Sequence, residues 1–218
     1  MKRPHIIINC AMSADGKIAS PLRRQIRISS EEDIARVHRL RNLCDAILVG
    51  VGTVISDNPK LTVKDKYVKK PRHPIRIVLD SHLRVPKDAL ILDGSSKTMV
   101  FTLNRNKKED ITNNPNVEVI VCKTDAKGQV DIKEVLSILY KRGVKKLLVE
   151  GGSTVIWEFI SNGLVDDLYV YIGSCIIGGA DTPTLCDGEG IKTLSPINLQ
   201  IISTKRLGSG LLIHYKLT

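Results

Sequence analysis

The stretch KLLVEGGSTVIWEFI, residues 146–160, decides the fold class. Its first part contains the short apolar run 147–149, which is typical of a buried strand. Its last part has apolar residues at 155, 156, 159 and 160, the spacing of one helix face. Gly151 and Gly152 lie where the strand pattern gives way to the helix pattern, and Ser153 or Thr154 is expected to cap the helix.

This junction between strand and helix has the features of an anion-binding site. Backbone N–H groups converge at the positive end of a helix dipole. Two adjacent glycines let a ligand approach the backbone because no Cβ stands in the way. We therefore expect a phosphate or pyrophosphate here. A plain tight turn is the alternative.

A second stretch repeats the arrangement. The apolar run 46–49 predicts a strand that ends in Gly50-Val51-Gly52-Thr53. Two such junctions facing each other would hold both ends of a dinucleotide.

The remaining periodicities complete an α/β pattern. Further strands are expected at 5–12, 74–80, 98–103, 117–122, 168–172, 198–206 and 211–217, with helices at 29–42 and 131–142. Strands that alternate with helices and finish in consecutive strands indicate a mixed, mostly parallel sheet with flanking helices. No linker interrupts the pattern, so residues 1–218 are expected to form a single domain.

Composition narrows the classes of function. Hydrophobic residues make up 42% of the chain, which argues against disorder, and no apolar run approaches the ~20 residues of a membrane span. A cytoplasmic protein is the default expectation. The five cysteines show no zinc-type spacing, so we expect reduced core thiols and no metal.

The formal charge of +10 fits nucleic acid or a small polyanionic ligand. Only one aromatic residue, Tyr67, lies among the basic residues of 60–76, and the whole chain has only eight. A stacking surface for single strands is thus poorly supported. A basic nucleic-acid-binding module remains the less favoured alternative.

Common catalytic motifs are missing from the sequence. A dinucleotide fingerprint that begins at Gly50 would need glycine at position 55, which is Ile55. No Gly-Lys-Ser/Thr, HExxH or Gly-x-Ser-x-Gly pattern occurs. What remains is typical of an enzyme in which a bound cofactor carries the chemistry.

Six segments, taken in order, resemble the riboflavin-pathway pyrimidine reductases. They are residues 9–19, 36–41, 45–54, 57–63, 76–81 and 148–152. The resemblance implies a dihydrofolate-reductase-like fold, a homodimer, and NADPH as the reductant of a ribosylamino-pyrimidine 5′-phosphate. The chain is most similar to the free-standing archaeal or fungal type, which acts on 2,5-diamino-6-ribosylamino-4(3H)-pyrimidinone 5′-phosphate. The deaminated 5-amino-6-ribosylamino-uracil phosphate or another heterocycle is the alternative substrate.

The resemblance also implies roles for individual residues. Cofactor contacts are implied at Thr53, Asp57, Ser81, His82, Leu83, Arg84, Val130, Gly151, Gly152, Ser153 and Thr154. Substrate contacts are implied at Asn9, Arg41, Leu61, Lys64 and Glu150. Asp57 and Glu150 are the candidate proton donors. The alternative is that Asp57 only caps a turn and that Glu150 is a solvated acid at the end of a strand. The resemblance further implies a cis peptide between Gly151 and Gly152.

Overall fold

The computed structural model describes residues 2–104 and 114–218. The chain divides into two compact units, and each unit combines two separate parts of the sequence. Unit 1 contains residues 1–5 and 39–147, and unit 2 contains residues 6–38 and 148–218. The expected single domain over 1–218 stays a prediction.

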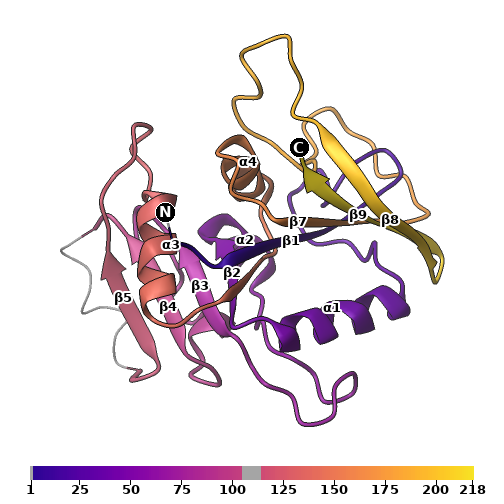
Figure 1. Ribbon diagram of the computed structural model, residues 1–218. Helices are drawn as coiled ribbons and strands as arrows, with labels where there is room; N and C mark the ends of the chain where they lie inside the picture. Colours follow the sequence, from indigo (N-terminus) through magenta and orange to yellow (C-terminus); the bar gives the residue numbers. More distant parts are fainter. Residues whose placement is uncertain (1, 105–113) are drawn as a thin grey trace. The chain divides into compact units, whose positions relative to one another are not determined.

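Unit 1 is a parallel α/β unit (Figure 1). Its strands lie in the order β5 (Val117–Val121), β4 (Thr98–Thr102), β3 (Ile75–Leu79) and β2 (Ala46–Gly50), and every pair is parallel. All five residues of β2 and of β4 are buried, as expected for strands covered on both faces. Strand β2 has no polar side chain, whereas β4 has a threonine at each end.

The helices of unit 1 follow from sequence signals. Helix α3 (Ile132–Lys141) is capped by the Asp131 side chain, which accepts hydrogen bonds from the backbone N–H groups of Lys133 and Glu134. Its buried face consists of Ile132, Val135, Leu136 and Leu139, as the spacing predicts. The short helix α2 (Val51–Asp57) follows β2 directly, and a single turn, η1 (Leu90–Leu92), precedes β4.

Unit 2 combines parallel and antiparallel pairing (Figure 1). Strand β1 (His5–Met12) pairs parallel with β7 (Asp167–Ile172), which pairs antiparallel with β9 (Gly210–Leu217). Strand β8 (Leu199–Leu207) pairs antiparallel with β9. Helix α4 (Ser153–Ser161) belongs to this unit, whereas α1 (Glu31–Leu43) and β6 (Lys146–Val149) each run from one unit into the other.

The predicted fold class is confirmed, since four of the six pairings described above are parallel and helices alternate with strands. Two details differ from the sequence expectation. The N-cap of α4 is Gly152 rather than Ser153 or Thr154, because the extended backbone of Gly152 places Ser153 inside the helix. All five cysteines are free, but only Cys44 is fully buried.

Arg76 is a fully buried charged residue of unit 1. Its side chain is fully buried and donates from Nε to Thr98 Oγ1 (2.9 Å), from Nη1 to Asp93 Oδ1 (2.9 Å) and from Nη2 to the Ser96 carbonyl (2.7 Å). We expect Arg76→Met to lower the free energy of unfolding by about 3 kcal/mol, because these acceptors lose a buried cationic donor. Urea denaturation measures the change.

The matched control is Arg142→Met. Arg142 donates from Nη2 to Glu118 Oε1 (2.7 Å), but 36% of the Arg142 side chain and 39% of the Glu118 side chain are exposed. Loss of the ion pair between Arg142 and Glu118 is expected to lower the free energy of unfolding by about 1 kcal/mol or less. Equal losses for the two variants would contradict this assignment of the buried charge.

Candidate active site

The glycine junction at Gly50–Gly52, in unit 1, places Thr53 and Asp57 on α2. Gly50 is the N-cap, and no side chain of the described residues caps the helix. Buried Val51 and Val54 anchor it. Thr53 and Asp57 are four residues apart and so lie on the same helix face. The Asp57 carboxylate accepts a hydrogen bond from Ser56 Oγ (2.9 Å).

The loop after β3 gathers several predicted cofactor contacts. Ser81 Oγ accepts a hydrogen bond from the Val130 backbone N–H (3.1 Å) and donates to Gln129 Oε1 (3.0 Å). Leu83 is buried and adopts φ +54°, whereas His82 and Arg84 are exposed. The loop therefore leaves His82 and Arg84 open to solvent, while Ser81 joins it to Val130.

Asp80, which is fully buried, fixes the conformation of the loop 81–84. Its Oδ2 accepts a hydrogen bond from the Val85 N–H (2.8 Å), and the Leu83 N–H donates to its carbonyl (3.1 Å). These bonds hold the two ends of residues 81–84 close together. The sequence analysis did not assign a role to Asp80, although it lies within the family segment 76–81.

Three predicted substrate contacts also lie in unit 1. Arg41, near the end of α1, donates from Nη1 to the Thr62 carbonyl (3.2 Å). Leu61 precedes that residue and is buried with φ +49°. Lys64 is exposed, and its carbonyl accepts hydrogen bonds from the N–H groups of Tyr67 and Val68. Arg41 is thus attached to the segment that carries Leu61 and Lys64.

The glycine junction at Gly151–Gly152, in unit 2, follows β6. Glu150 is half-buried, and the Gly151–Gly152 peptide is cis, which confirms the expectation. Gly151 has φ +116°, and a Cβ built on it would meet no atom within 4 Å. Because no described side chain caps α4, the first N–H groups of the helix are available to an anion.

A loop that the sequence analysis did not assign reinforces this junction. Asp187 accepts hydrogen bonds from Thr184 Oγ1 (2.6 Å) and from the Thr184 backbone N–H (3.2 Å), and the Ser153 side chain lies near enough to lower its pKa. Burial raises the pKa of Asp187, but these hydrogen bonds outweigh burial and lower it overall. Gly188 lies against Trp157, because a Cβ at position 188 would come within 2.4 Å of the indole. The first turns of α4 therefore lie against residues 187 and 188.

The Cys10 thiol lies near Cys186 and Glu150. Burial, followed by the proximity of Cys186 and of the Glu150 carboxylate, raises the pKa of the Cys10 thiol to about 12. Cys10 therefore stays protonated at neutral pH. Its neighbour on β1, Asn9, is buried and accepts a hydrogen bond from Arg36 Nη2 (2.7 Å).

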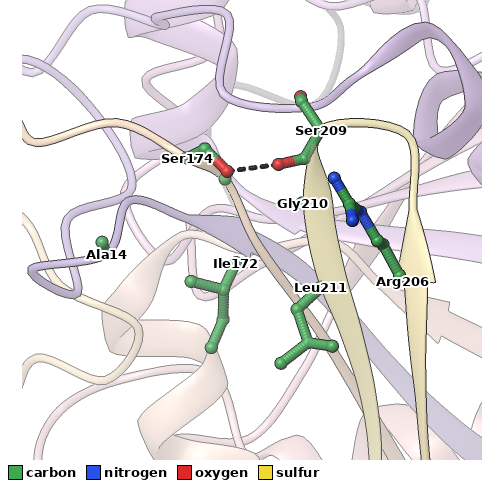
Figure 2. Close-up of a pocket in the computed structure, with 8 residues that line it drawn as sticks. Ala14, Ile172, Ser174, Arg206, Ser209, Gly210 and Leu211 are labelled. Carbon is green, nitrogen blue, oxygen red and sulfur yellow. Dashed lines mark hydrogen bonds between the residues drawn. The ribbon is translucent and has the colours of Figure 1, made fainter.

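An open pocket of about 400 Å³ lies elsewhere in unit 2 (Figure 2). It is lined by Ala14, residues 172–174, Arg206 and residues 209–211. The Ser174 hydroxyl donates to the Ser209 carbonyl across it. None of the predicted site residues lines this pocket.

The sequence profile of the RibD C-terminal domain matches residues 4–213. The chain belongs to the RibD C-terminal domain family. It is 40% identical over 216 residues to the 2,5-diamino-6-ribosylamino-4(3H)-pyrimidinone 5′-phosphate reductase of Archaeoglobus fulgidus, with 95% of each chain covered. It is 38% identical to the reductase of the same name from Methanothermobacter thermautotrophicus, with 98% of each chain covered.

A solved member of the RibD group shows the same fold. The deaminase/5-amino-6-(5-phosphoribosylamino)uracil reductase of Thermotoga maritima superposes with a TM-score of 0.83 at 27% identity. The match covers 99% of this chain and 57% of that bifunctional chain. The family inferred from the six sequence segments is confirmed.

The donor set of this RibD-family chain fits a nicotinamide dinucleotide. In unit 2, the uncapped helix N-terminus after Gly152 suits a pyrophosphate. In unit 1, the exposed Arg84 suits a phosphate. Among residues 2–104 and 114–218, no group of three or more His, Cys, Asp or Glu side chains could hold a metal ion. No described helix combines the length and apolar character needed to cross a membrane.

Proposed function

We propose that this chain reduces the ribosyl side chain of 2,5-diamino-6-ribosylamino-4(3H)-pyrimidinone 5′-phosphate to ribityl, with NADPH as reductant. The near full-length likeness to two reductases of that name carries the proposal. The uncapped junction at Gly151–Gly152 supports a bound dinucleotide. The deaminated pyrimidine is the second candidate substrate, because the T. maritima relative is named for a uracil reductase.

The proposed reaction adds one hydride and one proton to the substrate. The C1′–O4′ bond of the ribosylamine breaks as a C1′=N double bond forms, and the N–H proton passes to O4′. The resulting imine then gains a hydride at C1′ and a proton at the nitrogen. NADPH, when bound, supplies the hydride. Glu150 and Asp57 are the two acids proposed to hold the proton for the nitrogen.

The other proposed site residues position the reactants. The N–H groups after Gly152 bind the pyrophosphate, and Arg41 and Lys64 bind the substrate phosphate as cations. Thr53, His82 and Leu83 add cofactor contacts, and Asn9 and Leu61 add substrate contacts. Holding both reactants in place and excluding water is the main contribution of the protein.

Arg84 tests the choice of cofactor. We expect wild-type protein to be stabilised far more by NADPH than by NADH, because Arg84 meets the 2′-phosphate with a charge-assisted hydrogen bond. Arg84→Ala should weaken NADPH binding by about tenfold, the equivalent of roughly 1.4 kcal/mol, and leave NADH binding unchanged. Thermal shift titrations with both nucleotides measure this.

Arg142→Ala is the matched control, since it removes the same charge from an exposed ion pair with Glu118. It should leave both affinities unchanged. Equal stabilisation of the wild type by the two nucleotides would count against the 2′-phosphate contact. A homodimer and a cytoplasmic location stay predictions.

A further inference from the structure

Asn9 is a polar side chain in the apolar strand β1, where it follows three buried isoleucines. The strand register places it beside Tyr169 of β7, and Tyr169 lies beside His214 of β9. Residues opposite each other in a sheet share a face. Asn9, Tyr169 and His214 therefore form one row across three strands of unit 2.

Arg36 of α1 reaches the start of this row. Its Nη2 donates to Asn9 Oδ1 at 2.7 Å. A guanidinium has only donors, so the amide oxygen of Asn9 must face it. The amide nitrogen then points the other way, and Asn9 Nδ2 donates to no residue in the described part of the chain.

The guanidinium is itself fixed on two sides. Its Nε donates to Asp33 Oδ1 (2.7 Å), and the Asp33 side chain, only 1% exposed, accepts a further bond from Ser29 Oγ (2.6 Å). On the other side the guanidinium carbon lies 6.0 Å from the centroid of the Tyr169 ring. A largely buried arginine whose Nε and Nη2 donate to two different residues has few alternative rotamers.

Tyr169, which lies beside Arg36, is itself held by a contact with β9. The Tyr169 ring stacks on His214 with centroids 4.3 Å apart and planes 14° apart. His214 Nε2 in turn lies 2.7 Å from Asp167 Oδ1. Each member is thus held by a directional contact, so Arg36 presents one fixed orientation to Asn9.

We propose that Arg36 is a positioning residue that fixes the Asn9 carboxamide with Nδ2 directed at the substrate. Asn9 then offers one hydrogen-bond donor to an oxygen atom of the pyrimidine or the ribose. This inference rests on the proposed function, in which Asn9 contacts substrate. It adds that the contact selects an acceptor atom and that Arg36 sets this selectivity.

Asn9→Asp is the sharpest test. Aspartate keeps the shape of the side chain and its bond to Arg36 but replaces the free donor with an acceptor. We expect KM for the substrate to rise by about tenfold or more, since one hydrogen bond is lost and two acceptors then face each other. The Kd for NADPH and the Tm should stay at wild-type values. An unchanged KM in this variant would overturn the proposal.

Arg36→Met and Arg36→Lys test the positioning role itself. Methionine keeps the apolar stem and removes the donor, so KM should rise about tenfold, while lysine should recover part of the loss. In a double-mutant cycle with Asn9→Ala, the double variant should be no worse than Asn9→Ala alone. If the KM increases of the two single variants multiply in the double variant, Arg36 acts independently of Asn9 and the proposal is overturned.

A readout independent of turnover separates this inference from the proposed function. The side-chain amide of Asn9 should give two resolved NMR resonances in the wild type, which shift in Arg36→Met. If the wild type does not turn over the pyrimidine, the proposed function fails, and these resonances decide the positioning claim alone. Identical resonances in wild type and Arg36→Met would overturn it.

Discussion

Glu150→Gln is expected to lower kcat by about two to four orders of magnitude, the contribution usual for a positioned general acid. Glu150 directly follows β6 and precedes the glycine junction, so it lies beside the proposed cofactor site. Glutamine keeps the shape but cannot release a proton. Single-turnover kinetics with saturating NADPH measure the chemical step.

Asp57→Asn is the companion variant, because Asp57 is the second candidate acid. A wild-type rate for Glu150→Gln with a large loss for Asp57→Asn would move the proton to Asp57. Near-normal turnover of both variants would show that neither acid is needed, and water would then supply the proton. The fold should be unaffected in either variant, which an unchanged Tm verifies.

Gly151→Ala is expected to abolish most NADPH binding and to destabilise the protein by about 1–3 kcal/mol. The backbone at Gly151 has φ +116°, a conformation that residues with a side chain rarely adopt. The added Cβ would also project into open space where the pyrophosphate is proposed to lie. Nucleotide fluorescence titration and thermal denaturation measure the two effects.

Gly163→Ala is a matched control at the other end of α4. Gly163 follows the C-cap Asn162, has φ +62°, and a Cβ on it would also meet nothing within 4 Å. Alanine there should cost about 1 kcal/mol and leave NADPH affinity unchanged. If Gly151→Ala and Gly163→Ala bound NADPH equally well, the junction would not be the pyrophosphate site.

Much of this fold was predictable because its strands and helices have strong, regular patterns. The apolar run 46–49 is wholly buried in β2, and the spacing in 131–142 matches the buried face of α3. Asp131 and Gly163 mark helix ends in the way their residue types predict. Short-range physics decides such features, so one sequence suffices to find them.

The capping of α4 was predicted incorrectly for a local reason. Ser153 is a good N-cap by residue type, but Gly152 takes that position and the Ser153 side chain instead lies near Asp187, whose pKa it lowers. That partner lies 34 residues further along the chain. The spacing of Thr184 and Asp187 is a weak turn signal, and nothing in it specifies contact with α4.

The candidate site shows the same limit. The family segments located Glu150, the glycines and the loop 81–84, but they did not predict the contact between Ser81 and Val130. The support of Asn9 by Arg36 was also missed, because it joins a strand to a helix 27 residues away. Long-range polar contacts of this kind leave no periodic pattern in the sequence.

Transfer of a labelled hydride is the most direct test of the proposed reaction. The protein is incubated with the diamino-ribosylamino-pyrimidinone phosphate and NADPH that carries deuterium on either face of the nicotinamide C4. The account predicts a ribityl product in which one of the two labels appears at C1′. A product without deuterium from either cofactor, or recovery of unchanged substrate, would contradict it.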